Sequence, residues 1–217
     1  MNGMNNMNKD ALVLLTKAGL EKCLLRMTEV SPGAWRLGDV RVFKGQVREA
    51  LRSRERGGSR SVPNGTGQYS FSSTPLSGDE KPAAAIRIKI KGATPFVTAI
   101  IFNPEDIKHI SRCFAEEQYY GPVSEEQPDV TVIEIGNILL NALANSLLRG
   151  FGKSAIPSVP AHFQGDYGAI EKWLGAGPEV FTIISAKFAM RREDRVSAAE
   201  ILAFLPPTLA EDPQPLK

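Results

Sequence analysis

The sequence predicts an α+β protein in which a mostly antiparallel sheet is covered by helices. Two stretches, residues 9–117 and 128–207, each read as a helix followed by about three strands, and this repetition indicates an internal duplication. The chain has 217 residues, which is long enough for one sizeable hydrophobic core. We therefore expect a single domain over residues 9–207 that consists of two related halves.

The first half begins with a predicted helix over residues 9–29. Its apolar residues recur at helical spacing: Leu12, Leu15, Leu20, Leu24 and Met27. Residues 34–44 then alternate between apolar and polar types, which predicts a strand. Residues 45–81 lose this pattern and carry arginines among glycine, serine and proline, so we expect a long, flexible insertion with room for a short helix at its start.

Two more strands and a helix complete the first half. Isoleucines alternate with charged residues up to Lys91, as in a half-exposed strand, and residues 96–102 are almost entirely apolar, as in a central strand. Asn103 and Pro104 are residue types that cap and open a helix, which we expect to end near Glu117. The predicted buried face of this helix comprises Ile107, Ile110 and Phe114.

The helix predicted over residues 128–152 carries a narrow polar line. At ~100° per residue, four side chains fall within a sector roughly 80° wide. They are Glu134, Asn137, Asn141 and Asn145. The far side is filled by Leu139, Leu140, Leu143 and Leu147. Such a helix is largely buried, and its polar line is either a solvated edge or a set of side chains placed for chemistry.

Local signals support the limits of this helix. Asp129 is a candidate N-cap and Gly150 a left-handed stop, although the β-branched residues from Val130 to Ile133 prefer strand. Gly136 has no side chain, so another element can pack closely against the back of the helix.

The rest of the second half is predicted to be mainly strands. Lys153–Ala161 reads as a short strand, and Pro157 and Pro160 place it at a sheet edge. The segments that follow are a glycine-rich stretch with a turn of helix at 170–174 (163–177), a long strand (180–190) and a strand or short helix (196–205). We expect the tail over residues 208–217 to be disordered.

Composition excludes several classes of function. A formal net charge of +2 gives no support for a polyanion-binding surface, so we expect no nucleic-acid partner. No apolar run approaches the ~20 residues needed to cross a bilayer, and the N-terminal residues lack the basic-then-apolar order of a secretory signal. We therefore expect a cytoplasmic protein without membrane insertion.

The cysteines and His109 give no case for a metal site. Cys23 and Cys113 are far apart in apolar helical contexts, so we expect both to be reduced and buried. His109 has Glu105 and Asp106 one turn before it and Cys113 one turn after it, a set from which a metal site could be built. Because the helix dipole already explains the two acids, we predict a surface or packing role for His109.

A short motif resembles the signature of a known family. Glu134-Ile135-Gly136-Asn137, followed by Pro160 after twenty-two intervening residues, resembles the signature of the CheC/CheX/FliY family of phosphatases that act on the phosphorylated response regulator CheY. In that signature a serine or aspartate stands four residues before the glutamate. The chain departs from the signature there, because that position is Val130. The apolar strand that ends in Phe102-Asn103-Pro104 before a helix also resembles a strand-to-helix step of CheC-like proteins.

The resemblance implies a CheC-like fold of two pseudo-repeated halves and a chemotaxis-type hydrolase of two-component signalling. It implies that Asn137 holds the attacking water and that Glu134 pairs with a lysine of the CheY-like response regulator. Asn141, Asn145 and Pro160 are expected to contact this partner. Mg²⁺ is expected on the response regulator, and no cofactor or metal is expected to be bound by this chain.

Some members of this family carry two Glu-x-x-Asn helices, and this chain resembles a one-site member. Matching Leu24-Leu25-Arg26 to Leu147-Leu148-Arg149 aligns the two predicted helices at an offset of 123 residues. At this offset the four polar positions are occupied in the first helix by Ala11, Leu14, Ala18 and Lys22. A second site, if there was one, has been erased.

Two other functions stay open at the level of the sequence. CheC-like folds also occur as scaffolds or switch components that resemble FliM and FliN, and Val130 suits such a non-catalytic adaptor for a response regulator or signalling protein. The arginines of residues 45–81 could instead bind RNA, although this stretch shows little of the aromatic platforms that single-strand binding uses. A CheD-like protein and a second copy of the chain are further candidate partners.

Overall fold

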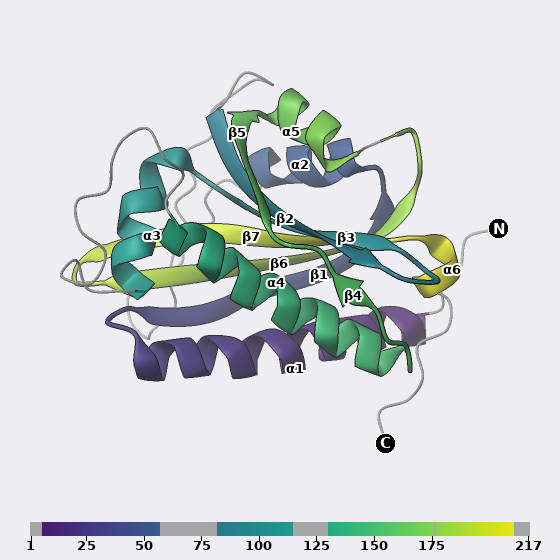
Figure 1. Cartoon of the computed structure of the whole chain (residues 1–217), viewed down its shortest axis with the longest axis horizontal. Coiled ribbons are helices and arrows are strands. Elements are labelled where there is room, and N and C mark those ends of the chain that lie inside the picture. The colour runs from purple at the N-terminus through teal and green to yellow at the C-terminus, as the bar shows by residue number, and fades with distance from the viewer. Residues whose placement is uncertain (1–5, 57–81, 115–129, 176, 211–217) are drawn as a thin grey trace.

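The computed structural model describes residues 6–56, 82–114, 130–175 and 177–210 (Figure 1). The helices and strands are, in chain order, α1 (Asn6–Val30), β1 (Ala34–Gly45), α2 (Val47–Arg56), β2 (Pro82–Lys91), β3 (Phe96–Phe102), the 3-10 helix η1 (Pro104–Asp106), α3 (Ile107–Phe114), α4 (Val130–Gly150), β4 (Ile156–Pro157), β5 (Ala161–Asp166), α5 (Tyr167–Leu174), β6 (Phe181–Arg192), β7 (Arg195–Leu205) and α6 (Pro207–Ala210).

In the described residues, seven strands form one sheet in the order β1-β6-β7-β3-β2-β4, and β5 also pairs with β2. Every pair of neighbouring strands is antiparallel. The hairpins β2–β3 and β6–β7 meet at the centre, where β3 pairs with β7. Outside them, β1 pairs with β6 of the other half and β5 pairs with β2 of the other half. This symmetric order confirms the predicted α+β fold of two pseudo-repeated halves.

Helices cover both faces of the sheet (Figure 1). Helices α1, α3 and α4 pack on one face over a core that includes Leu20, Ile88 and Leu140. Helices α2 and α5 pack on the other face over a smaller core that includes Leu51 and Ile170. Successive side chains of a central strand point to opposite faces, so these strands are buried on both sides and read as apolar runs.

The helices α1 and α4, which correspond to each other in the two halves, pack together closely. A Cβ atom on Gly19 would lie 2.6 Å from the Cβ atom of Ser146, so a residue with a side chain would force the helices apart. Ser146 Oγ donates a hydrogen bond to the backbone carbonyl of Leu15 at 2.7 Å. The side chain of Leu15 also fills the space in front of Gly150. These contacts fix α4 against the first half of the chain.

Helix α4 agrees closely with its prediction. It begins at Val130 and ends at Gly150, while the predicted cap, Asp129, lies outside the described residues. Gly136 has its predicted role, because a Cβ atom there would lie 2.7 Å from Ile86 Cδ1 on β2. By length and composition α4 could cross a membrane, which the sequence analysis did not expect, but half of it is buried inside the protein, as in the core helix of a folded domain.

The second half departs from the predictions between α4 and α5. The strand predicted over Lys153–Ala161 is reduced to β4, and the chain pairs again in β5, within a stretch predicted to be irregular. Pro157 and Pro160 explain the interruption, because proline has no N–H for the ladder. Helix α5 is longer than the predicted single turn, since Asp166 Oδ1 accepts a hydrogen bond from Ala169 N at 2.6 Å and caps it.

The last predicted element is resolved as a strand. The segment 196–205, predicted as a strand or short helix, forms most of β7 and pairs with β3 on one side and β6 on the other. The described chain then continues beyond the predicted end at residue 207 into α6, where Leu209 is buried. The predicted tail lies outside the described residues from 211 onward.

In the first half, α3 is rotated relative to its prediction. Its buried residues are His109, Ile110 and Cys113, whereas Ile107 and Phe114 are only half-buried. The rotation follows from a hydrogen bond that draws His109 toward β7, described below. Asn103 precedes the helix as predicted, but its side chain makes no capping hydrogen bond, because the first turn is the 3-10 helix η1. The start of the predicted insertion is α2, and residues 57–81 lie outside the described residues.

Candidate functional site

The polar line predicted from the sequence lies on the outer side of α4. Glu134 and Asn145 are exposed, and Asn137 and Asn141 are half-buried. The other sides of the helix are buried in the core at Ile135, Leu139, Leu143 and Leu147. The two residues with predicted catalytic roles, Glu134 and Asn137, therefore project from a helix whose backbone is held rigidly by the core.

Three side chains of this line are joined by hydrogen bonds. Asn141 Nδ2 donates to Asn137 Oδ1 at 2.7 Å and to the backbone carbonyl of Asn137 at 2.8 Å. Asn137 Nδ2 donates to Glu134 Oε2 at 3.5 Å, at the long end of the hydrogen-bond range. Asn145 lies one turn further along the helix. We call the set Glu134, Asn137 and Asn141 the polar triad.

Asn137 keeps hydrogen-bonding capacity within the triad. A carboxamide offers two N–H donors and two lone pairs on its oxygen. One N–H faces Glu134 and one lone pair faces Asn141, so one donor and one acceptor are left for a water molecule or a partner. Glu134 is an exposed carboxylate, which accepts hydrogen bonds and pairs with cations. The triad can therefore orient a water molecule and bind a positively charged group.

Pro160 lies on the sheet edge and not on α4. It is half-buried in the segment between β4 and β5. This segment is tied to β2, because Ser158 N donates to the carbonyl of Lys89 at 2.8 Å and Lys89 N donates to Ser158 Oγ at 3.0 Å. Its neighbour Val159 is 84% exposed. The proline thus belongs to an edge segment of fixed position with an apolar exposed residue beside it.

His162 lies on β5, two residues after Pro160, and is not among the predicted site residues. It pairs with Ile86 of β2, and Ile86 is the side chain that fills the space in front of Gly136 on α4. Directly paired residues of antiparallel strands project to the same face, so His162 lies on the α4 side of the sheet edge. Burial lowers the pKa of His162 and favours its neutral form. Its position two residues after Pro160, on the same face of an extended segment, is the sequence signal that could have found it.

Position 130 adds no polar group to the site. Val130 stands in the first turn of α4 and is 70% exposed. Its side chain has neither a hydroxyl nor a carboxylate, so it can supply none of the hydrogen bonds that a serine or aspartate would make there. The departure from the signature is therefore a real difference in chemistry at the head of the polar line.

The cluster around His109 has a packing role. The ring is buried, and its Nδ1 lies 2.8 Å from Ser197 Oγ, which donates to Asp106 Oδ1 at 2.9 Å. Arg195 Nη2 donates to the same carboxylate oxygen at 3.0 Å. Burial, and after it the charge of Arg195, lowers the pKa of His109. These bonds connect the start of α3 to β7, and no group of three potential metal ligands occurs in the part of the chain that the structure describes.

Both cysteines are free thiols. Cys113 is buried, and burial raises its pKa to about 11. Cys23 is half-buried, and burial raises its pKa as well. A raised pKa keeps a cysteine in the unreactive thiol form, so neither residue has the character of a nucleophile.

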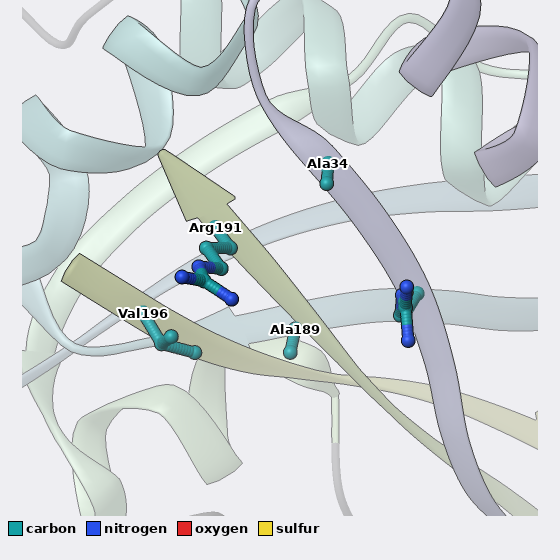
Figure 2. Close-up of a pocket in the computed structure, with 5 residues that line it drawn as sticks. Ala34, Ala189, Arg191 and Val196 are labelled. Carbon is teal, nitrogen blue, oxygen red and sulfur yellow. The ribbon is translucent and has the colours of Figure 1, made fainter. Parts of the chain in front are cut away.

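A small hollow lies on a different part of the sheet, over β1, β6 and β7 (Figure 2). Its lining residues are Ala34, Arg36, Ala189, Arg191 and Val196. Its volume of about 10 Å³ holds at most about one water molecule, so it is too small for a metabolite. The candidate site is instead the polar line of α4, which lies on the surface of the protein.

Comparison with known proteins identifies the fold. No protein-family model and no curated protein matches the sequence. Among solved structures, the chain is similar to FliY of Thermotoga maritima, at 10% sequence identity and a TM-score of 0.60, with 97% of this chain and 95% of that chain covered. The chain has the CheC-like fold. A structure of the FliG–FliM complex from H. pylori also matches the chain, at 10% identity and a TM-score of 0.56, with 93% of this chain and 96% of that chain covered.

A CheX protein from Desulfovibrio desulfuricans is also similar to the chain, at 10% identity and a TM-score of 0.47, with 89% of this chain and 99% of that chain covered. At 10% identity, the similarity to FliY and to the FliG–FliM structure shows the fold alone, and the roles of individual residues depend on the geometry of this chain. Within the CheC-like fold, the Glu134 and Asn137 motif stands on one of two related helices of the same face.

Proposed function

We propose that this CheC-like protein is a phosphatase that removes the aspartyl phosphate of a CheY-like response regulator. The observation that supports the proposal is the position of Glu134 and Asn137. They stand one turn apart on the outer side of α4, with Glu134 exposed and Asn137 half-buried, in a fold shared with FliY. Residues that served only to solvate a core helix would not need to be two amides and a carboxylate in hydrogen-bond contact.

The chemistry asks little of the visiting protein. Hydrolysis of an aspartyl phosphate needs a water molecule in line with the departing carboxylate, and the charge on the phosphoryl oxygens must be neutralised. A response regulator brings its own divalent metal ion, Mg²⁺, and a lysine. This chain then has only to supply orientation, which is a large part of the barrier in such reactions.

Asn137 and Glu134 have the chemistry for this division of labour. The free lone pair of Asn137 Oδ1 accepts a hydrogen from the water molecule and directs the water oxygen toward phosphorus. Glu134 pairs with the lysine of the response regulator and fixes the docking angle. Neither group is a strong base, which suits a reaction limited by orientation. Asn145, Pro160 and the exposed Val159 contact the surface of the partner around this centre.

The test is release of phosphate from a response regulator phosphorylated with acetyl phosphate in the presence of Mg²⁺. We expect the protein to accelerate release, and Asn137→Ala to lower the acceleration by about 100-fold or more. The matched control is Leu14→Ala, which truncates the exposed residue at the equivalent position of α1 and should leave the rate unchanged. A wild-type protein that binds the phosphorylated regulator without acceleration would refute the phosphatase.

A non-catalytic scaffold is the second candidate, and two observations favour it. The first is that the fold is also similar to a structure of the FliG–FliM complex. The second is that position 130 is an exposed valine, which has no polar side chain. A scaffold of this kind would bind a response regulator or another signalling protein through the same outer side of α4. In that case Asn137→Ala would weaken binding while the rate of phosphate release stays at its background value in every variant.

The remaining partners belong to the same proposal. A phosphatase for a response regulator would work in the cytoplasm, alone or under a CheD-like regulator, and could do so as a homodimer. Sedimentation of the purified chain, alone and with a CheD-like protein, measures both associations directly. We expect no binding of RNA at low or at high salt concentration, because no nucleic acid is expected as a partner.

A further inference from the structure

The geometry points to Asn141 as the positioning residue that fixes the carboxamide of Asn137 in the orientation needed to hold a water molecule. The inference deepens the proposed phosphatase function and rests on it for its catalytic consequence. Its structural half, the fixed orientation of the Asn137 side chain, can be measured in the protein alone.

The spacing along α4 brings these side chains together. Residues three and four apart on a helix are neighbours on one face, which places Glu134 before Asn137 and Asn141 after it. The two hydrogen bonds differ in length, and the difference assigns the roles. Asn141 contacts Asn137 Oδ1 at 2.7 Å, whereas Asn137 reaches Glu134 only at 3.5 Å. Asn141 therefore holds Asn137, and Glu134 stays available to a partner.

Asn141 is itself anchored. The same Nδ2 group that contacts Asn137 Oδ1 donates to the backbone carbonyl of Asn137 at 2.8 Å. A backbone carbonyl of a buried helix cannot rotate, so it holds the amino group of Asn141 toward Asn137. The amino group that Asn141 directs toward Asn137 can only donate, so the atom of the Asn137 side chain that it meets must be the oxygen.

The other end of the triad imposes the same direction. The carboxylate of Glu134 is an acceptor only, so the nitrogen of Asn137 faces it. The oxygen and nitrogen of a planar carboxamide lie on opposite sides, so the side chain has two orientations related by a flip. The contacts with Glu134 and with Asn141 both favour the same one. Asn137 then presents one free lone pair and one free N–H outward, and the lone pair is the group that accepts a hydrogen from an attacking water. A flipped amide would present the wrong atom at this place.

The decisive substitution is Asn141→Asp, which keeps the shape of the side chain and removes the donor. The carboxylate would repel the backbone carbonyl and Oδ1 of Asn137, releasing the carboxamide or turning its nitrogen toward position 141. The matched control is Ala18→Asp, which makes the same change of charge at the exposed equivalent position of α1. Asn141→Gln restores an amino donor at this position.

The kinetic arm uses phosphate release from the phosphorylated response regulator. We expect Asn141→Asp to lower kcat by about tenfold with KM changed less than about twofold, Asn141→Gln to recover most of kcat, and Ala18→Asp to match wild type. A residue that only binds the partner would change KM instead. An unchanged kcat in folded Asn141→Asp, or an equal loss in Ala18→Asp, overturns the inference.

The structural arm uses the side-chain amide resonances of Asn137 in NMR spectra of the isolated, full-length protein. We expect one fixed orientation in wild type and in Ala18→Asp, with the amide protons close to Glu134, and a shifted or averaged pair of resonances in Asn141→Asp. If the wild-type protein releases no phosphate, the proposed function fails, and this arm still decides whether Asn141 positions Asn137. An Asn137 amide that is averaged in wild type, or unaffected in Asn141→Asp, overturns the positioning role.

Discussion

Helices α1 and α4 occupy corresponding places in the two halves and differ in their outward chemistry. At the offset of 123 residues the inward positions agree, since Leu12, Leu20 and Leu24 of α1 are buried like their counterparts in α4. The buried counterparts are Ile135, Leu143 and Leu147. At the positions that correspond to the polar triad, α1 carries Ala11, Leu14 and Ala18, and Leu14, the counterpart of Asn137, is 62% exposed. The fold therefore tolerates an apolar residue where α4 has its polar triad.

This difference weakens the explanation that the polar line only solvates a helix. If exposure alone required polar residues there, α1 would need them at least as much as α4 does. Asn137 and Asn141 are in fact less exposed than Leu14 and Ala18. At these two positions the polar residues are on the helix where they are less exposed and the apolar residues on the helix where they are more exposed, which is opposite to the order that solvation would give.

A second difference concerns how much of each helix is covered. Leu140, Ala144 and Leu148 of α4 are buried, whereas their counterparts in α1 are exposed. These counterparts are Lys17, Glu21 and Leu25. Helix α4 is thus covered on one more side than α1, and its polar triad borders that covered side. A site beside a fixed flank can hold a partner in one orientation, which the bare side of α1 cannot do.

The largest effect is expected when α4 is given the residue of α1 at the central position. Asn137→Leu should lower phosphatase activity by about 100-fold or more, because a leucine can neither accept from nor donate to a water molecule. The thermal midpoint should stay close to wild type, since the side chain faces outward as Leu14 does. Phosphate release measures the activity, and a melting curve on the same sample measures the thermal midpoint. An active Asn137→Leu protein contradicts the prediction.

The next effect concerns the contact between α4 and the sheet. Gly136→Val copies Val13 of α1, and we expect it to lower the free energy of unfolding by about 1–3 kcal/mol, because the new atoms meet the side chain of Ile86. Urea denaturation measures the loss. Adding Ile86→Ala to the Gly136→Val protein should recover part of the lost free energy of unfolding. If the double variant instead loses the sum of the two single losses, the contact with Ile86 is not the cause.

A smaller effect is expected when α1 is given the triad of α4. Ala11→Glu, Leu14→Asn and Ala18→Asn, combined in the Asn137→Leu protein, should raise its phosphate release less than about twofold, because α1 lacks the covered flank that orients a partner. The same assay measures the gain. Recovery of most of the wild-type rate would show that the polar residues suffice without the flank.

The smallest effect is a pH dependence that compares one histidine from each half. Burial lowers the pKa of both His109 and His162 below the ordinary value of 6.5. The unfolded chain therefore binds protons more readily than the folded chain, and the free energy of unfolding should fall as the pH drops through about 6.5. Urea denaturation at pH 7.5 and 5.5, chosen to lie about one unit on either side, measures this fall.

Replacement of each histidine in turn shows which of them causes the loss of unfolding free energy at low pH. His162→Gln and His109→Gln should each reduce the difference in unfolding free energy between the two pH values. His109→Gln will also lower stability at the higher pH, because the buried bond to Ser197 is changed. If neither replacement alters the difference, the pH dependence arises from other groups.

Local sequence patterns predicted the parts of the fold that local physics determines. The polar line, the packing role of Gly136 and the two hairpin strands β2 and β3 follow from periodicity and residue size, and they are present. The position of β5 and of His162 depends on which strand pairs with β2, a choice made between distant segments of the chain. The rotation of α3 likewise depends on Ser197, which lies far along the sequence on β7.

The candidate site was partly readable for the same reason. The spacing of Glu134, Asn137 and Asn141 places them on one face, but spacing does not state which amide donates to which. That direction is set by the backbone carbonyl of Asn137 and by the rotamers of the triad, which only the structure gives. Pro160 had the spacing of a known signature, and its attachment to β2 through Ser158 became visible only in the sheet.

The crosswise pairing of the sheet shows what the half without the polar triad contributes to the helix that carries it. Ile86, which packs against Gly136 of α4, lies on β2 of the first half. Gly19, where α1 packs closely against α4, also belongs to the first half. Separation of the two halves would therefore remove the strand that packs against α4 and the helix that lies beside it. The first half thus supports α4 as a separate subunit would, although it belongs to the same chain.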